Sequence, residues 1–104
     1  MKCAVLGGTG WQGAGVAVRI VSAGHHAIIG SRTLLRAEQL CAKIPVTLNL
    51  PETGFSAMTN SEAASTADVI FVVVPINAHR ALLEEIKPFV QGKIVVGVTA
   101  PVDP

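Results

Sequence analysis

Residues 3–13 read Cys-Ala-Val-Leu-Gly-Gly-Thr-Gly-Trp-Gln-Gly, and this stretch decides the fold. A short apolar run leads directly into Gly8-x-Gly10-x-x-Gly13, and a segment compatible with a helix follows. In a strand–turn–helix unit, such glycines allow a tight turn, a close approach of the backbone to a pyrophosphate, and close packing of the helix on the strand. The unpaired N–H groups at the helix start then face the phosphates. The pattern therefore predicts a dinucleotide-binding site at Gly8, Gly10 and Gly13.

The residues after the second apolar run indicate which dinucleotide binds. Residues 27–32 read Ala-Ile-Ile-Gly-Ser-Arg, and no Asp or Glu occurs between residues 1 and 35. A site for NAD would place a carboxylate here to accept hydrogen bonds from the ribose 2′-OH. This chain offers the hydroxyl of Ser31 and the guanidinium groups of Arg32 and Arg36, which suit a 2′-phosphate. We interpret the ligand as NADP; the alternative is that both arginines are ordinary solvated charges at a helix start.

Composition bounds the class of protein. With 104 residues, half of them apolar and 14% charged, the chain fits one domain whose parallel strands are covered on both faces. A net charge of +1 gives no hint of a nucleic-acid partner. The longest apolar stretch, residues 69–74, is too short to span a bilayer, and the start lacks a signal-peptide pattern. We therefore expect a cytoplasmic protein without a membrane partner. Cys3 and Cys41 are expected to be small core residues.

Strand-like and helix-like segments alternate along the whole chain. The expected strands are residues 2–6, 27–31, 55–58, 69–74 and 93–98, and the expected helices are residues 11–23, 33–43, 59–67 and 77–87. Residues 46–50 also alternate like a strand, so the third strand could lie there, although 55–58 leads more directly into the next helix. This order predicts a doubly wound parallel sheet, a Rossmann-type fold with about five strands and helices on both faces.

Local signals refine these elements. Gly24 is expected to end the first helix, and Thr59 with Glu62 forms a capping box that opens the third. In the last helix, the side chains expected to point inward are Leu82, Leu83 and Ile86. His25 and His26 are expected at the surface. His79 could approach the nicotinamide, but a solvated position is favoured. No set of His, Cys and acidic residues has metal-ligand spacing.

The chain stops at Pro104, directly after its fifth expected strand. A complete dinucleotide-binding fold usually has a sixth strand, and an enzyme also needs a place for its second substrate. We therefore expect residues 1–104 to be an NADP-binding domain that forms the amino-terminal part of a longer enzyme.

Four groups of segments together resemble the NADPH-dependent coenzyme F-420 reductases (NADP:deazaflavin oxidoreductases). The matching segments are Ala4–Gly10 with Gly13, Gly24-His25 with Gly30–Arg32, Asn60-x-x-Ala63-Ala64 with Ala67-Asp68, and Lys93–Val96 with Thr99–Pro101. The resemblance covers almost the whole chain, but only the amino-terminal half of the family's length. It implies an oxidoreductase, or the cofactor domain of one, with NADP(H) as cofactor and coenzyme F-420 as co-substrate.

The resemblance also assigns roles to residues. The residues that would line the pyrophosphate are Thr9, Gly10, Trp11 and Gln12. The residues that would hold the 2′-phosphate are Ser31 and Arg32, together with Thr9. Arg36 occupies a position where the family usually has a basic residue. Those that would lie near the nicotinamide and its ribose are Val74, Pro75 and Ile76, together with residues 100–102, which include Val102. Family members are commonly homodimers, so a homodimer is also implied.

Direct hydride transfer between two planar rings needs positioning and exclusion of water, and no catalytic side chain is expected. Two alternatives stay open. The chain could be a non-enzymatic NADP sensor of the short-chain-dehydrogenase type, whose active members need a tyrosine that this sequence lacks. It could also be the cofactor domain of another NADPH-dependent reductase, acting on an imine, a keto acid or a metal.

Overall fold

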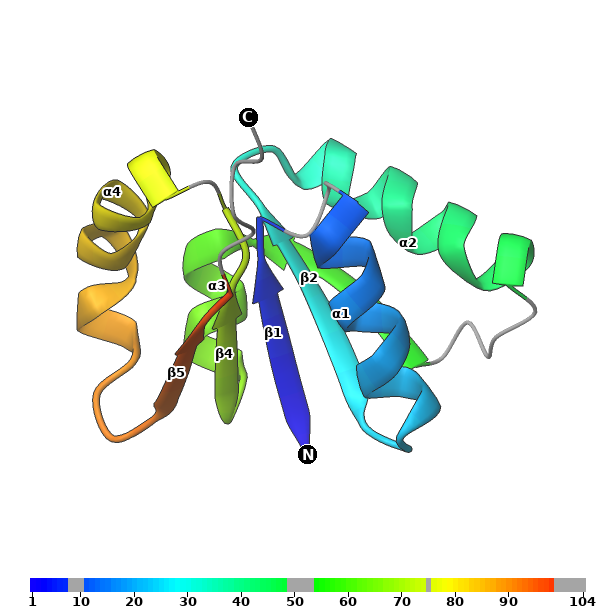
Figure 1. Ribbon diagram of the computed structural model, residues 1–104, viewed down its shortest axis with the longest axis horizontal. Coiled ribbons are helices and arrows are strands. Elements are labelled where there is room, and N and C mark those ends of the chain that lie inside the picture. Colours follow the sequence, from blue (N-terminus) through cyan, green and yellow to red (C-terminus); the bar gives the residue numbers. More distant parts are fainter. Residues whose placement is uncertain (8–10, 49–53, 75, 99–104) are drawn as a thin grey trace.

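A computed structural model describes residues 1–7, 11–48, 54–74 and 76–98. Along the chain, its elements are β1 (Lys2–Leu6), α1 (Trp11–Ser22), β2 (His26–Ser31), α2 (Leu34–Leu48), β3 (Phe55–Thr59), α3 (Asn60–Thr66), β4 (Val69–Val72), α4 (Ile76–Ile86), the 3₁₀ turn η2 (Lys87–Phe89) and β5 (Ile94–Gly97). The strands form one sheet in the order β3-β2-β1-β4-β5, and every pairing is parallel. The expected doubly wound sheet is confirmed (Figure 1).

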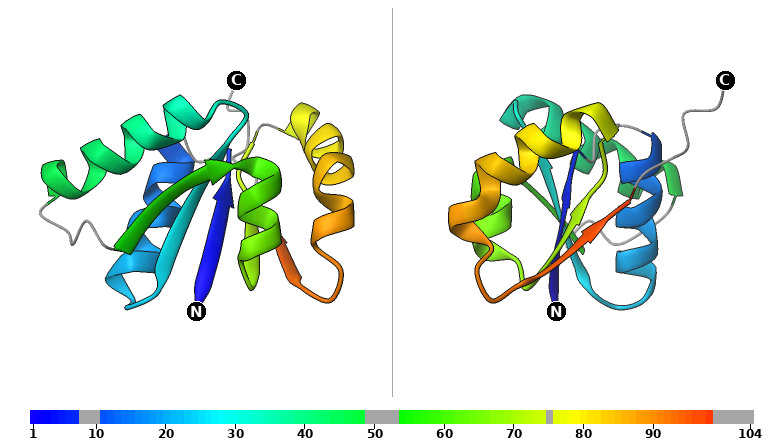
Figure 2. Two further views of the ribbon diagram at one scale, coloured as in Figure 1. Left: turned by 180° about the vertical axis from the view of Figure 1, so that it is seen from behind. Right: turned by 60° about the vertical axis from the view of Figure 1, so that its left-hand side comes forward.

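The alternation of side chains along β1 and β2 divides the core into two layers. Cys3 and Val5 of β1 pack with residues of α1 and α2 on one face of the sheet. Ala4 and Leu6 pack with residues of α3 and α4 on the other face. Because successive side chains of a strand point to opposite faces, one short strand supplies both cores. Figure 2 shows the two helix layers from behind and from the side.

Gly24 ends α1 as expected. Its φ is +90°, a backbone conformation that glycine adopts without steric cost. The N–H of Gly24 donates to the carbonyl of Val21 (3.0 Å), and the N–H of His25 donates to that of Ile20 (3.1 Å). These two bonds form a Schellman motif, which satisfies carbonyls at the end of α1 and turns the chain into β2.

The capping box at the start of α3 is also present. The Oγ1 atom of Thr59 accepts from the backbone N–H of Glu62 (3.4 Å) and donates to Glu62 Oε1 (3.1 Å). Thr59 ends β3, so the third in-sheet strand is the expected one at residues 55–58.

Three expectations about the elements are wrong in detail. Helix α2 continues through Pro45 to Leu48, so residues 46–48 are helical and the alternative strand does not begin there; residues 49 and 50 lie outside the described part. Pro45 removes one helical hydrogen bond, but burial of Ile44 and Pro45 offsets that loss. Strand β4 ends at Val72, although the N–H of Val73 still donates to the carbonyl of Leu6 (2.9 Å).

The third correction concerns α4. Leu82 and Ile86 are buried against the sheet, whereas Leu83 is 41% exposed. Successive residues of a helix lie about 100° apart, so burial of the Leu82–Ile86 stripe turns Leu83 towards the outer side of α4.

Within the described residues, no helix is long and apolar enough to cross a bilayer.

Candidate functional site

The strand order reverses between β1 and β4, and in open parallel sheets a ligand-binding crevice is expected at the carboxyl ends of two such strands. From β1 the chain winds through α1 and α2 towards β3 on one side, and it then crosses to β4 and β5 on the other (Figure 1). The helices that follow β1 and β4 therefore lie on opposite faces of the sheet. In open parallel sheets, ligands bind at this point of reversal. The glycine-rich segment leaves β1 at the same place, as the sequence predicts.

Gly7 is the residue that fixes the exit from β1. Its φ is +79°, and an added Cβ would lie 2.4 Å from Val74 Cγ1 and 2.5 Å from the carbonyl oxygen of Val73. The N–H of Gly7 also donates to the carbonyl of Gly30 at the end of β2 (3.2 Å). The predicted dinucleotide motif begins at Gly8 and assigns no role to Gly7. The signal was present, because Gly7-x-x-Gly10-x-x-Gly13 is a second glycine spacing in the same segment.

The start of α1 meets the crevice. The helix begins at Trp11, a few residues beyond the end of β1, and Gly13 is buried in its first turn. A buried glycine in the first turn allows close packing of α1 on the sheet, which is the role predicted for Gly13. The helix N-terminus therefore lies where a pyrophosphate would be expected. Gly8, Thr9 and Gly10 lie outside the described residues, as do Pro75 and Val102, and only the helical backbone is described at Trp11, Gln12 and Ile76.

Ser31, Arg32 and Arg36 lie together at the carboxyl end of β2. Ser31 is the last residue of β2 and is 7% exposed, and its Oγ accepts from the N–H of Thr33 (3.3 Å). The carbonyl of Thr33 in turn accepts from the N–H of Arg36 (3.1 Å). This turn begins α2 directly after β2, so Arg32 and Arg36 both lie close to the end of β2 along the chain, and both are exposed. The corner thus combines a fixed hydroxyl with two guanidinium groups, the donors that bind a phosphate monoester.

The other end of the crevice is formed by the ends of β4 and β5. Val74, after β4, is half-buried and packs against the core on the α3 and α4 side. His79 lies in the first turn of α4, and its Nε2 atom is buried without a hydrogen-bond partner among the described residues. The expectation that His79 is solvated is therefore wrong. Packing of α4 against the end of β5 covers this ring, and sequence periodicity does not show such a contact.

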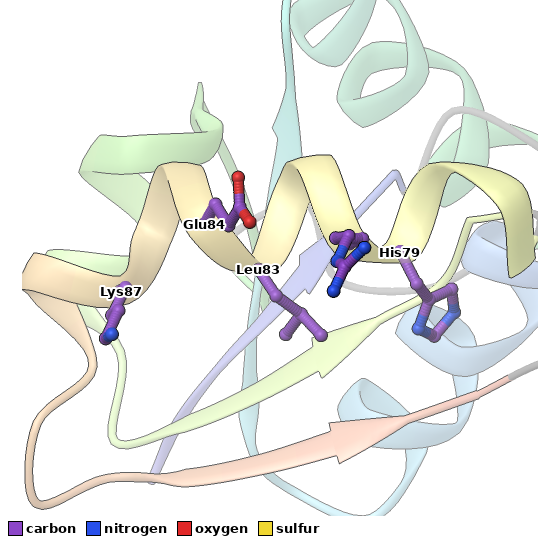
Figure 3. A pocket seen from close by; sticks show the side chains of 5 residues that line it. His79, Leu83, Glu84 and Lys87 are labelled. Carbon is purple, nitrogen blue, oxygen red and sulfur yellow. The ribbon is translucent and has the colours of Figure 1, made fainter.

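A separate open cavity of about 550 Å³ runs along the outer side of α4 (Figure 3). It is lined by His79, Arg80, Leu83, Glu84 and Lys87. Of these, only His79 lies at the carboxyl end of the sheet. Among the described residues, none of those predicted to bind the cofactor lines this cavity.

The side chains of His26, Cys3 and Cys41 lie at least partly within the packed fold. His26, expected at the surface, is half-buried, and its Nε2 is hydrogen-bonded to Ser56 Oγ (2.8 Å), which links β2 to β3. Cys3 is buried and Cys41 half-buried, and both are free thiols. Burial, with a smaller contribution from Glu38, raises the pKa of Cys41 to about 11, so its reactive thiolate is scarce near neutral pH. No group of three metal-ligating residues occurs in the ranges that the structure describes.

Comparison with known families agrees with this site. The family model described as "NADP oxidoreductase coenzyme F420-dependent" matches residues 2–101. The chain belongs to this family.

Three curated relatives, each named "F420-dependent NADP reductase", support the assignment. The protein of Methanothermobacter marburgensis is 40% identical over 103 residues, which cover 99% of this chain and 46% of the relative. The protein of Methanothermobacter thermautotrophicus is 38% identical over 99% of this chain and 44% of its own length. That of Methanocaldococcus jannaschii is 35% identical over 97% of this chain and 46% of its own length. The chain thus spans about half the length of these relatives.

Proposed function

We propose that residues 1–104 form the NADP(H)-binding, amino-terminal domain of a longer oxidoreductase, which transfers hydride between NADPH and the deazaflavin coenzyme F-420. The turn from β2 into α2 supports the cofactor choice, because it carries the buried Ser31 and the exposed Arg32 and Arg36 and has no carboxylate. The family and the names of the curated relatives support the co-substrate.

The described residues fit an NADP(H) molecule laid across the carboxyl edge of the sheet. The 2′-phosphate would be held at Arg32 and Arg36, and the pyrophosphate would lie at the start of α1. Gly7 fits this arrangement because any side chain there would collide with the residues after β4. When bound, NADPH supplies the hydride. The domain itself supplies positioning and electrostatic neutralisation of the phosphates.

Binding of NADPH and NADH to the chain, measured by isothermal titration calorimetry, tests the cofactor assignment. We expect the chain to prefer NADPH. Arg32→Glu removes a charge-assisted hydrogen bond and adds repulsion, so NADPH affinity should fall by about 100-fold. The same variant should bind NADH at least as well as the unchanged chain, because a carboxylate suits the ribose 2′-OH.

Arg19→Glu is the matched control. Arg19 is an exposed residue in the last turn of α1, at the opposite edge of the sheet, and this change alters the net charge equally. It should leave both affinities unchanged. If both variants lost NADPH affinity equally, the effect of Arg32→Glu would be explained by the change in net charge alone. The assignment of the 2′-phosphate site would then fail.

The reaction is tested on the longer enzyme. A steady-state assay of NADPH oxidation, with the oxidised deazaflavin as acceptor, should show turnover that Arg32→Glu reduces. Reduction of an imine, a keto acid or a metal in place of the deazaflavin would overturn the proposed co-substrate and leave the NADP assignment intact. NADP binding without turnover of any acceptor would favour the sensor alternative.

We also propose that the longer enzyme is a homodimer, as the resemblance to the family implies. Light scattering coupled to size-exclusion chromatography would measure its mass directly. A monomeric mass at concentrations that support full activity would contradict this proposal.

A further inference from the structure

The imidazole of His79 is buried at one nitrogen and lacks a partner there. His79 lies in the first turn of α4, and its Nε2 has no accessible surface and no hydrogen-bond partner among the described residues. A buried polar atom without a partner destabilises a folded protein, and such atoms are rare in native structures. A group that supplies the missing hydrogen bond is therefore expected outside the described chain.

The position of the ring is set by the last residue of β5. An ideal Cβ built on Gly97 would lie 3.5 Å from His79 Cε1 and 3.9 Å from its Nδ1. The ring therefore lies over a glycine backbone at the carboxyl end of β5, and Figure 3 shows it extending from α4 towards that strand. His79 thus lies beside the carboxyl end of β5, at the edge of the sheet where the ligand is expected.

The sheet order indicates which end of the dinucleotide meets this edge. The proposed 2′-phosphate site is at the end of β2, and α1 begins beyond β1, where the pyrophosphate would lie. In the order β2-β1-β4-β5, the remaining end of an extended dinucleotide reaches the ends of β4 and β5. This end carries the nicotinamide, whose carboxamide offers both a carbonyl acceptor and an N–H donor.

We infer that His79 is a positioning residue: its Nε2 is covered in the ligand-free chain, and the imidazole turns on binding so that Nε2 hydrogen-bonds to the carboxamide of the nicotinamide. The inference rests on the proposed NADP function. Either tautomer of a neutral imidazole fits, because the carboxamide can donate or accept. The neighbouring charged side chains Arg80 and Glu84 of α4 and Lys87 of η2 line the cavity beside α4, which His79 also lines.

Two probes separate this role from that of the adenosine end. NADPH carries the nicotinamide, whereas adenosine 2′,5′-bisphosphate carries the 2′-phosphate and lacks it. For His79→Leu, NADPH affinity should fall by about five- to tenfold, the loss expected for one hydrogen bond, and affinity for the bisphosphate should not change. His79→Gln keeps an N–H donor and a carbonyl acceptor, so it should restore part of the NADPH affinity.

The thermal stability of the ligand-free chain is a second readout. His79→Leu removes an unsatisfied buried nitrogen, so its Tm should equal or exceed that of the unchanged chain while NADPH binding weakens. A purely structural histidine would give the opposite result, a lower Tm with equal weakening for both probes. His25→Leu is the matched control, because His25 is exposed in the turn after α1, and it should change neither affinity.

The outcomes distinguish this inference from the proposed function. If the unchanged chain binds both probes, and the His79→Leu variant binds NADPH as tightly as the unchanged chain, the role of His79 is overturned and the NADP assignment stands. If the unchanged chain binds neither probe, the NADP assignment itself fails and the inference falls with it.

Discussion

The central strand β1 and the edge strand β5 contrast in burial although both are rich in apolar residues. In β1, every residue after Lys2 is buried, and Val5 has no exposed surface. In β5, Ile94 is 65% and Val95 37% exposed. Ile94 pairs with Val69, and Val69 packs on the α1 side of the sheet. Ile94 therefore lies on the same face of the sheet, beyond the part of that face that α1 covers. Figure 2 shows β5 at the margin of the described fold.

This difference shows that the apolar character of a strand does not by itself predict how deeply its side chains are buried. Strand β1 has a neighbouring strand on each side and helices on both faces, whereas β5 pairs only with β4 among the described residues. The proposed site for the adenosine end of the dinucleotide therefore lies on the well-packed half of the sheet. The nicotinamide end is built on the less covered half.

Replacing one isoleucine in each half gives the largest expected effect. Ile29→Ala in β2 deletes a side chain with no exposed surface and should lower the free energy of unfolding by about 4 kcal/mol. Ile94→Ala in β5 should cost less than about 1 kcal/mol, because that side chain is already in water. Urea unfolding measures both. Equal losses would mean that β5 is as well buried as β2, and the contrast would disappear.

Two glycines with positive φ separate steric contact from backbone strain. Gly7→Ala combines a φ of +79° with contacts of 2.4–2.5 Å and should destabilise the fold by about 3 kcal/mol. Gly92→Ala, before β5, has a φ of +77° and nothing within 4 Å, so only the backbone penalty of about 1 kcal/mol applies. Denaturant midpoints compare the two, and equal shifts would show that the contact with the residues after β4 is unimportant.

Lys93 ties the exposed end of the sheet to the body of the protein. Its Nζ donates to the carbonyls of Ala64 (2.8 Å) and Ser65 (2.6 Å) in α3. Lys93→Met should destabilise the fold by about 1.5 kcal/mol, through loss of these charge-assisted bonds near the end of the helix. Lys87→Met, at an exposed lysine of η2, is the control and should cost less than about 0.5 kcal/mol. Hydrogen exchange in β5 should accelerate in the first variant alone.

An effect confined to alkaline pH is expected at Cys41 in α2, in the well-packed half. The pKa of Cys41 is raised from 9.0 to about 11 in the folded chain. Between these values the unfolded chain loses the thiol proton first and binds fewer protons, so the free energy of unfolding should fall as pH rises. Cys41→Ala should make this decline shallower in urea titrations from pH 9 to pH 11. An unchanged slope would show that Cys41 is as solvated as a thiol in the unfolded chain.

Local patterns predicted the elements of the fold well. The capping residues Thr59 and Glu62 and the glycine stop at Gly24 occur because each depends on contacts within a few residues, and the strand at Phe55–Thr59 occurs where its apolar pattern predicts it. Helix α2 extends past its expected end because burial of Pro45 against the sheet outweighs its poor helix propensity. Leu83 was wrongly predicted to point inward, because α4 has more apolar residues than its one buried stripe can hold.

The candidate site divides in the same way. Ser31, Arg32 and Arg36 are close in sequence, so their proximity could be predicted from a strand end and a helix start. Gly7 and His79 depend on contacts between segments about 70 and about 20 residues apart, respectively. No spacing within one segment shows that Gly7 abuts the chain after β4, or that His79 lies over Gly97.

The amino-acid sequence determined the alternation of strands and helices, the glycine-rich turn and the arginine corner, because each arises from neighbouring residues and from the period of side chains along strands and helices. Only the tertiary structure decided which apolar side chains are buried, which glycine cannot carry a Cβ, and which histidine nitrogen lacks a partner. These properties depend on packing between distant segments, and the parallel order of the five strands brings those segments together.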